Sequence, residues 1–288
     1  MKIGFVTDSG SDIDSDYADK IGVKVVPLTI TFSDEDGMEY KEDRNFDYSS
    51  YYKKYTEVDG FLAKTAQPTP HDFFLAYEEL VKEGIDEIIV ITLSSGLSGT
   101  INSARLGYNI LKRKNDQVKV HLVDSLHASY AEVLLIEEGL RLRKQGLDGD
   151  EIVKKLREHV ARFKIYILFP SLKYLRKGGR ISVTKYILGT LLRKRPITVV
   201  NKEGKNEVAG SATETDEGIH KILEMTSEGF SRFPKQVVII HGNNEDYASK
   251  MEKQLKELYK DVKIKTRCTG VTISAHTGPD VVALISEF

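Results

Sequence analysis

The sequence predicts an α/β fold with two domains. Residues 1–162 are expected to form a doubly wound domain around a parallel sheet, and residues 163–288 a smaller α+β domain with a largely antiparallel sheet. The first observation is the run from Ile88 to Leu93, which is apolar except for Thr92, as in a strand buried on both faces. The second is that strands alternate with amphipathic helices in the first half. The third is that strands follow one another across short turns in the second half.

Apolar periodicity gives the expected elements of the first domain. Strands are predicted at residues 3–6, 23–32, 88–93 and 118–123. Helices are predicted at residues 13–21, 46–55, 70–84, 101–111 and 126–140. The helix beginning at Pro70 is the best marked, because Thr69 is a good capping residue and Asp72 lies in the first turn.

The strand at residues 88–93 runs into a loop of hydroxyl and glycine residues, Ser94-Ser-Gly-Leu-Ser-Gly-Thr100. The loop precedes a helix and so lies at the carboxyl edge of the sheet, where α/β proteins bind ligands and helix N–H groups attract anions. It is not a P-loop, because Gly99 is followed by Thr100 and not by lysine, and it lacks the spacing of a nucleophile elbow. The loop therefore suits a small oxyanion. The alternative is structural, with Ser98 capping the helix and Gly96 making the turn.

Two more strands end in serine-bearing loops, which begin at Ser9 and Ser125. Before the first of these, Asp8 could act as a nucleophile or metal ligand, or it could brace the loop through Asx-type hydrogen bonds. Thr65 precedes Pro68 in a stiff, extended stretch. A rigid hydroxyl at that place suits ligand positioning, although a solvated loop threonine is the commoner case.

The second half shows many strands and few helices. Strands are expected at residues 197–200, 237–240, 262–265, 271–275 and 281–285, and helices at 215–226 and 245–259. His276 follows one of these strands at a turn with Gly278 and Pro279. A single histidine is no metal site, and alone it is more often structural than reactive.

Charge is distributed unevenly along the chain. From His159 through Lys202 there is no Asp or Glu, whereas eleven basic residues occur there: Arg162, Lys164, Lys173, Arg176, Lys177, Arg180, Lys185, Arg193, Lys194, Arg195 and Lys202. Such a stretch could meet nucleic acid, an acidic partner or a phosphorylated ligand, or it could be a solvated face. Arg180 follows two glycines, so its guanidinium could clamp an oxyanion from a sharp turn.

Composition bounds the compartment. The 288 residues are 40% hydrophobic and 30% charged, with a net charge of −1, as in ordinary globular proteins. One cysteine, Cys268, excludes a disulfide framework and a multi-cysteine metal site, so a reducing cytosol is expected. No segment reads as a signal peptide or a membrane span. We expect a cytoplasmic protein without cofactor or metal.

Six segments together give a resemblance that covers nearly the whole chain. In order, they are Thr7-Asp-Ser, Lys64-Thr-Ala-Gln-Pro, Ser94-Ser-Gly-Leu-Ser-Gly-Thr, Val123-Asp-Ser, Leu175-Arg-Lys-Gly-Gly-Arg and Ala275-His-Thr-Gly-Pro. Their order resembles the DegV family, which contains the fatty-acid-binding subunits of bacterial fatty acid kinase. The resemblance implies a bacterial, non-catalytic protein that holds one palmitate-like fatty acid between its two domains. The first domain would carry the carboxylate-binding loops, and the second would close over the acyl chain.

The resemblance also implies roles for particular residues. It places the carboxylate on Thr65 and on a serine of the Ser-Ser-Gly-Leu-Ser-Gly loop, for which we choose Ser98 over Ser95. Arg180 and His276 match positions linked in the family to head-group chemistry and to exchange with the kinase. The implied partners are the fatty acid and the catalytic subunit of a fatty acid kinase. The resemblance implies no nucleic acid and no membrane span, and it allows transient membrane contact.

Energetics favour a lipid over a compact polar ligand. Burying sixteen carbons at ~0.8 kcal/mol per methylene contributes roughly 12 kcal/mol, against an association cost of ~4–15 kcal/mol. Because hydroxyls alone compensate an ionised carboxylate poorly, a nearby cation is expected, with His276 or Arg180 as candidates.

Two other functions remain open from the sequence. One is a hydrolase or phosphotransferase that uses Asp8 or Ser95 with His276. The other is a nucleic-acid binder that uses the basic stretch between Arg162 and Lys202.

Overall fold

The computed structural model describes residues 2–181, 191–228, 234 and 236–288, and these form two compact units. The first unit comprises residues 1–47 and 63–161, and the second comprises residues 48–62 and 162–288. The short segment Tyr48–Leu62 thus leaves the first unit and joins the second. The sequence did not predict that this segment belongs to the second unit.

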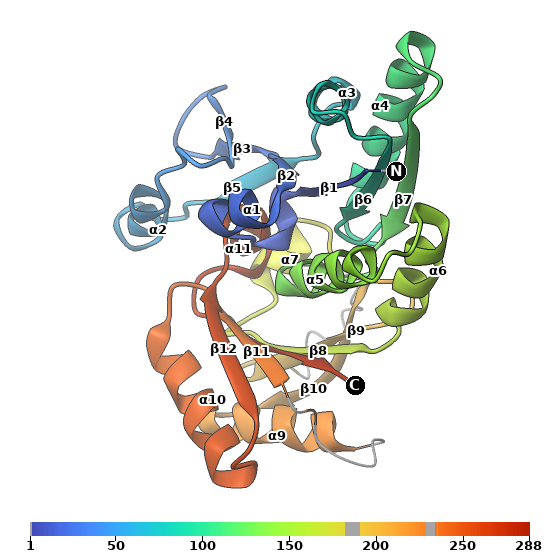
Figure 1. Cartoon of the computed structure of the whole chain (residues 1–288). Coiled ribbons are helices and arrows are strands. Elements are labelled where there is room, and N and C mark those ends of the chain that lie inside the picture. The colour runs from blue at the N-terminus through green and yellow to red at the C-terminus, as the bar shows by residue number, and fades with distance from the viewer. Residues whose placement is uncertain (1, 182–190, 229–233, 235) are drawn as a thin grey trace. The chain divides into compact units, whose positions relative to one another are not determined.

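The first unit is built on a four-stranded parallel sheet in the order β2-β1-β6-β7. Its strands are β1 (Ile3–Asp8), β2 (Val23–Val26), β6 (Glu87–Thr92) and β7 (Lys119–Asp124). Its helices are α1 (Ser15–Ile21), α3 (Pro70–Lys82), α4 (Thr100–Lys114), α5 (Tyr130–Lys144) and α6 (Gly149–Val160), with a 3-10 turn η1 (Ser9–Ser11). Helices α3 and α4 cover one face of the sheet, and α5 and α6 cover the other (Figure 1).

Strand β6 is buried on both faces, as the sequence predicts. Ile88 and Val90 pack into the cluster formed with α3 and α4, while Ile89 and Ile91, which point to the opposite face, are also fully buried. The prediction of a doubly wound parallel sheet in the first half is confirmed.

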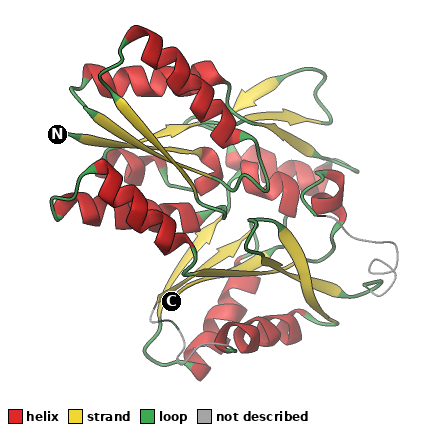
Figure 2. Cartoon of the chain, turned by 90° about the vertical axis from the view of Figure 1, so that its right-hand side faces the viewer, coloured by secondary structure: helices red, strands yellow, loops and turns green. Residues whose placement is uncertain are grey.

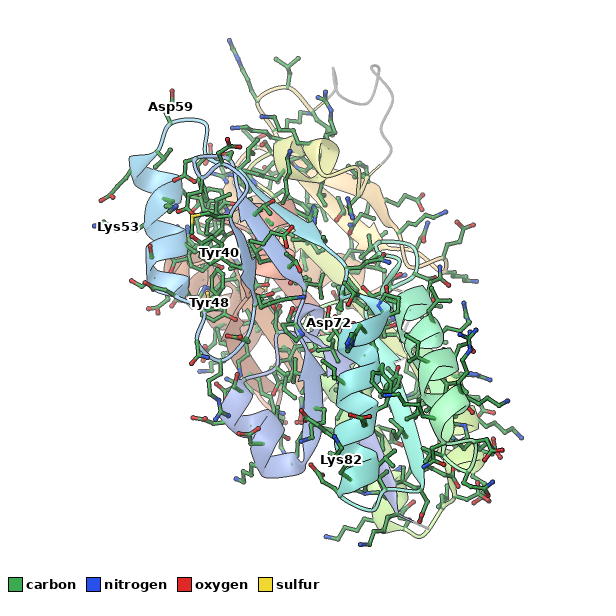
Figure 3. The ribbon with its side chains drawn as sticks, turned by 90° about the horizontal axis from the view of Figure 1, so that it is seen from above. Tyr40, Tyr48, Lys53, Asp59, Asp72 and Lys82 are labelled. Atoms are coloured by element: carbon green, nitrogen blue, oxygen red, sulfur yellow. The ribbon has the colours of Figure 1, made fainter. Side chains whose placement is uncertain are left out.

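Helix α3 starts where the sequence predicts. Thr69 Oγ1 accepts a hydrogen bond from the Asp72 N–H (3.1 Å), and Asp72 Oδ2 accepts one from the Thr69 N–H (2.8 Å), which together form a capping box before Pro70. Asp72 lies in the first turn and Lys82 in the last, so both charges oppose the helix dipole (Figure 3).

A small antiparallel sheet in the first unit carries Thr65. Its order is β4-β3-β5, with β3 (Thr29–Phe32), β4 (Glu39–Lys41) and β5 (Ala63–Ala66). Thr65 pairs directly with Ile30, so both side chains point to the same face of this sheet. Because Ile30 is fully buried, that face is the covered one.

The second unit contains a six-stranded sheet in the order β10-β9-β8-β13-β11-β12. The strands are β8 (Phe163–Leu168), β9 (Arg195–Val200), β10 (Asn206–Ala212), β11 (Gln236–His241), β12 (Lys263–Cys268) and β13 (Val282–Glu287). The helices are α2 (Tyr48–Glu57), α7 (Lys173–Lys177), α9 (Thr215–Ser227), α10 (Glu245–Leu258) and α11 (Val271–Thr277). All described strand pairings in this sheet are antiparallel except β11 with β12, which confirms the predicted α+β domain with a largely antiparallel sheet (Figure 2).

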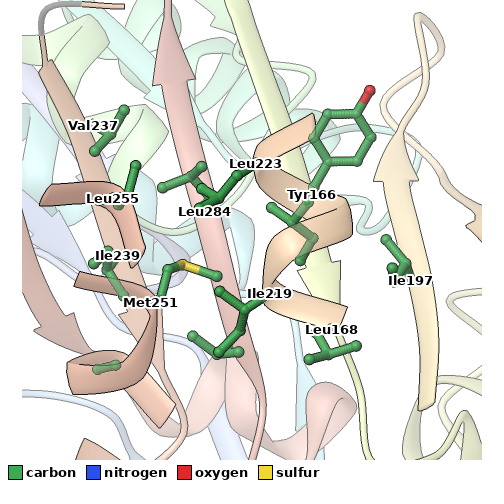
Figure 4. Packing of buried hydrophobic residues seen from close by; sticks show 13 residues of the cluster. Tyr166, Leu168, Ile197, Ile219, Leu223, Val237, Ile239, Met251, Leu255 and Leu284 are labelled. Carbon is green, nitrogen blue, oxygen red and sulfur yellow. The ribbon is translucent and has the colours of Figure 1, made fainter. Parts of the chain in front are cut away.

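The core of the second unit lies between its sheet and two helices. Ile219 and Leu223 of α9 and Met251 of α10 face Leu284 at the centre of the sheet (Figure 4). All four side chains are fully buried. The apolar spacing that predicts both helices therefore marks the residues that hold them to the sheet.

The predicted strand at residues 271–275 is wrong, because these residues form helix α11. The β-branched run Val271-Thr-Ile favoured a strand, but the buried positions include Val271, Thr272, Ser274 and Ala275, which lie on one side of a helix. Strands β8 and β10 and helix α6 were not predicted. Helix α6 does carry a local signal, the capping box that Asp148 forms with Glu151, which the prediction missed.

Candidate functional site

Three loops with serine residues meet the carboxyl edge of the parallel sheet, where β1, β6 and β7 end. Backbone hydrogen bonds tie them together. The Ser94 N–H donates to the His127 carbonyl (2.7 Å), the Ser125 N–H donates to the Thr92 carbonyl (3.2 Å), and the Ser129 N–H donates to the Gly10 carbonyl (2.7 Å). The predicted clustering of hydroxyl-bearing loops at one edge is therefore present in the structure.

Asp8 links two of these loops. Its Oδ1 accepts from the Gly10 N–H (2.9 Å), and its Oδ2 accepts from the Leu93 N–H (3.0 Å). Burial raises the pKa of the carboxyl to about 7, although both N–H donors act to lower it. Of the two roles that the sequence left open, the geometry supports bracing, because both oxygens already hold backbone donors and the side chain is fully buried.

Glu132 is a second buried acid at this edge, and the sequence did not point to it. It sits on α5, fully buried, and accepts a long hydrogen bond from Thr7 Oγ1 (3.5 Å). Its Oε1 has no hydrogen-bond partner among the residues that the structure describes. Burial, followed by the nearby charge of Asp8, raises the pKa of Glu132 well above its ordinary value, so the neutral acid is the favoured form. The available signal was a lone acid in the apolar run at residues 130–136.

Three residues at this edge other than glycine have positive φ angles, which such residues rarely adopt. The φ angles of Asp12, Leu126 and Ser129 are 54°, 52° and 59°. Each such conformation costs about 1–3 kcal/mol and tends to occur at functional sites. The Ser129 hydroxyl donates to an Asp12 carboxylate oxygen, which joins two of these residues.

The loop at residues 94–100 is held in shape by Ser94. The Ser94 carbonyl accepts from the Leu97 and Ser98 N–H groups (3.0 Å each), and its Oγ accepts from the Gly96 N–H (3.0 Å). The alternative in which Ser98 caps α4 is wrong, because Gly99 precedes the helix and no side chain caps it. Instead, Ser98 Oγ shares a hydrogen bond with Thr100 Oγ1 (2.9 Å). Ser98 is half-buried, whereas Ser95 is exposed.

The segment that carries Thr65 lies against this loop. Two residues after Thr65, Gln67 Nε2 donates to Ser103 Oγ on α4 (2.9 Å). The Gln67 side chain also covers Gly99 so closely that a Cβ at position 99 would lie 2.2 Å from Gln67 Oε1. The structure thus brings together the two segments that the resemblance assigns to the carboxylate.

Arg180 and His276 lie close to each other in the second unit. A Cβ at Gly178 would lie 2.3 Å from His276 Nδ1, so the Gly178-Gly179 turn fits against the ring. Burial and the charge of Arg180 lower the pKa of His276 to about 4. His276 is therefore neutral at neutral pH and supplies no positive charge there. The roles of both residues toward a head group stay predictions from the resemblance.

Helix α2 holds α11, which carries His276. Tyr51 shares a hydrogen bond with Ser274 (2.9 Å), and the Tyr52 hydroxyl donates to the Thr269 carbonyl (2.6 Å). This explains physically why Tyr48–Leu62 belongs to the second unit.

Three further features concern metal ligands, membrane-spanning helices and the basic stretch. Within the described ranges, no three His, Cys, Asp or Glu side chains group as a metal site, and no helix is long and apolar enough to cross a membrane. Of the eleven basic residues between Arg162 and Lys202, Lys185 lies outside the described residues.

Comparisons with known proteins identify the family. A family model described as "Uncharacterised protein, DegV family" matches residues 2–288. A DegV domain-containing protein of Caldanaerobacter subterraneus subsp. tengcongensis is 31% identical over 287 residues, which cover 99% of both chains. A crystal structure described as a DegV lipid binding protein from Thermotoga maritima matches with a TM-score of 0.86 and 28% identity, covering 100% of this chain and 99% of that chain. A structure of a DegV family protein from Thermus thermophilus, described by its fatty acid binding, matches with a TM-score of 0.87 and 27% identity over 100% of both chains. This chain belongs to the DegV family.

Proposed function

We propose that this protein binds a long-chain fatty acid, holds its carboxylate with the hydroxyls of Thr65 and Ser98, and presents it to a separate fatty acid kinase. The observation that carries the proposal is the contact between the Thr65 segment and the Ser98 loop, which Gln67 makes at Gly99. Family members of known structure that are described as lipid and fatty acid binding support the choice of ligand.

The hydroxyl chemistry at this edge fits a carboxylate better than a reaction. Ser98 and Thr100 already share a hydrogen bond, so their hydroxyls can reorient and donate to an incoming oxygen without a base. Asp8, the candidate nucleophile of the enzyme alternative, is buried and holds two backbone N–H groups. The proposed role is therefore binding and presentation, with the acyl chain supplying most of the affinity.

Lipid extraction tests the ligand. Gentle purification followed by denaturing extraction and mass spectrometry should recover about one palmitate-like acid per chain. Protein that carries no lipid, and that also fails to take up added palmitate, would contradict the proposal.

Alanine substitutions test the head-group residues. Thr65→Ala and Ser98→Ala should each weaken fatty-acid binding by about tenfold or more, because each removes a hydrogen bond of ~1.5–3 kcal/mol to a charged group. Thermal unfolding of the lipid-free variants should change little. Thr31→Ala is the matched control, since Thr31 lies on the neighbouring strand β3 and points to the opposite face from Thr65. Ser95→Ala separates the two serine candidates, and a larger effect there than at Ser98 would reassign the contact.

Presentation to a kinase has a separate test. With ATP and a bacterial fatty acid kinase catalytic subunit, the loaded protein should support acyl-phosphate formation, trapped as the hydroxamate. The same reaction with kinase and free fatty acid alone is the control. Equal product in both reactions would remove the presenting role while leaving fatty-acid binding intact.

A further inference from the structure

A concave site whose described lining residues all belong to the second unit is lined by cations. It encloses about 520 Å³, and five basic residues line it: Lys173, Arg176, Arg193, Lys194 and Arg195. No Asp or Glu is among its described lining residues. A concave surface with one sign of charge focuses its field on the space it encloses, so it attracts anions.

These cations lack acidic partners. None of the five makes an ion pair with any residue within the described ranges, whereas several other lysines of this protein pair with acids along helices. Lys173 and Arg176 are three residues apart on α7 and so lie on the same side of that helix. The repulsion among these five charges is therefore left without compensation from neighbouring acids.

The surrounding fold holds the cations in place. The Phe169 N–H donates to the Pro196 carbonyl (2.9 Å), which joins the loop after β8 to the start of β9 beside Arg195. Arg195 also lies over the Tyr247 ring, 5.7 Å from its centroid. Arg193, which also lines the cavity, adopts a φ of 60°, a conformation that residues other than glycine rarely occupy.

We propose that this cavity binds a small organic molecule that bears two or more linked phosphate groups, such as a nucleoside diphosphate. Five cations exceed what one phosphate can neutralise, whereas a diphosphate or triphosphate matches them more closely. The guanidinium groups of Arg176, Arg193 and Arg195 can each bind phosphate oxygens with two parallel hydrogen bonds. The volume lies in the range of small-molecule sites and exceeds that of a single phosphate.

The lining also favours a small molecule over a macromolecule. Leu172 and Leu191 are among the apolar lining residues and can contact the organic part of such a ligand. A long nucleic acid or acidic peptide would track a basic stripe, whereas these charges line one concave site. The site is independent of the fatty-acid proposal, and either proposal can fail without the other.

Calorimetric titration of the full chain tests the site with ADP, pyrophosphate, inorganic phosphate and adenosine at about 0.15 M NaCl, where weak surface attraction is screened. ADP and pyrophosphate should bind saturably, inorganic phosphate at least about tenfold more weakly, and adenosine not detectably.

Arg176→Glu and Arg193→Gly should each weaken ADP binding by at least about tenfold. Glycine is chosen at position 193 because it accepts the left-handed backbone without strain. Lys253→Glu, an exposed site on α10 with the same charge change as Arg176→Glu, should leave ADP binding within about threefold.

Three results would overturn the proposal. The first is no saturable binding of ADP or pyrophosphate up to about 1 mM, the affinity expected of non-specific contacts. The second is binding that Lys253→Glu weakens as much as Arg176→Glu does. The third is binding of an acidic peptide or of DNA, but not of ADP, that depends on Arg176, which would assign the cations to a macromolecule. Far-ultraviolet circular dichroism of each variant ensures that a loss of binding is not a loss of fold.

Discussion

Replacing Asp8 with asparagine should change how the stability of this protein depends on pH. In the folded chain, burial raises the pKa of Asp8 from 3.8 to about 7. Between these two values, the unfolded chain carries an ionised Asp8 while the folded chain keeps the proton, so folding takes up a proton. The stability that this provides is complete below about pH 4 and is lost as the pH rises through 7.

The size of the effect follows from the pKa difference. A displacement from 3.8 to about 7 corresponds to about 4 kcal/mol, at ~1.4 kcal/mol per pH unit. The asparagine side chain does not titrate, so the stability of the variant relative to the parent should rise by up to about 4 kcal/mol between pH 4 and pH 8. The amide cannot accept from both the Gly10 and Leu93 N–H groups, which adds a pH-independent penalty of about 1–3 kcal/mol.

Urea unfolding of the lipid-free protein, followed by circular dichroism at several pH values from 3 to 8, measures this difference. Asp72→Asn is the matched control, because its carboxyl shifts the other way. Burial acts to raise the pKa of Asp72, but hydrogen bonds from Thr69 and the charge of Lys41 outweigh burial and lower it. The stability that the ionised Asp72 carboxyl provides is therefore present above about pH 4 and is lost as the pH falls further. A stability gap between the parent and Asp8→Asn that stays the same from pH 4 to pH 8 would refute the reasoning.

Two glycine substitutions test the close contacts of the candidate residues. Gly99→Ala should displace the Gln67 side chain and weaken fatty-acid binding severalfold. Thermal stability should stay nearly unchanged. The lost Gln67–Ser103 hydrogen bond destabilises the fold by ~0.5–1.5 kcal/mol, whereas alanine stabilises it by ~0.4–1 kcal/mol by restricting the unfolded backbone. Binding equal to that of the parent would show that Gln67 does not position Thr65. Gly178→Ala should lower the free energy of unfolding by about 1–3 kcal/mol, because the new Cβ overlaps the half-buried His276 ring. A nuclear magnetic resonance titration of that ring should show an altered pKa. An unperturbed titration curve would mean that the turn relaxes without moving the ring.

The sequence predicted the elements that local signals define. Strand β6 is apolar on both faces and helix α3 carries its own cap, so both lie where the sequence places them. The segment from Val271 to Ala275 shows the limit of such signals. Its β-branched residues favour a strand, yet a contact from distant Tyr51 fixes Ser274 on a helix.

The candidate site was predictable only where a motif marks it. Thr65 and Ser98 lie in segments whose residue order carries the family resemblance, and the structure places those segments in contact. Glu132 carries no such mark, because a single acid in an apolar run reads as a surface position. Only the packing of α5 against the sheet shows that it is buried beside Asp8.

The electrostatics of this edge favour neutral hydroxyls over a lysine or arginine of the first unit as direct contacts to a carboxylate. Glu132 feels the charges of Asp8, Asp12 and Asp124, so the first unit gathers several acids beneath its loops. A lysine or arginine among them would pair with these acids and lose its hold on a ligand. Neutral donors such as Thr65 and Ser98 avoid that competition. The raised pKa of Glu132 keeps that acid protonated at neutral pH, whereas Asp8, with a pKa of about 7, gains negative charge as the pH rises through that value.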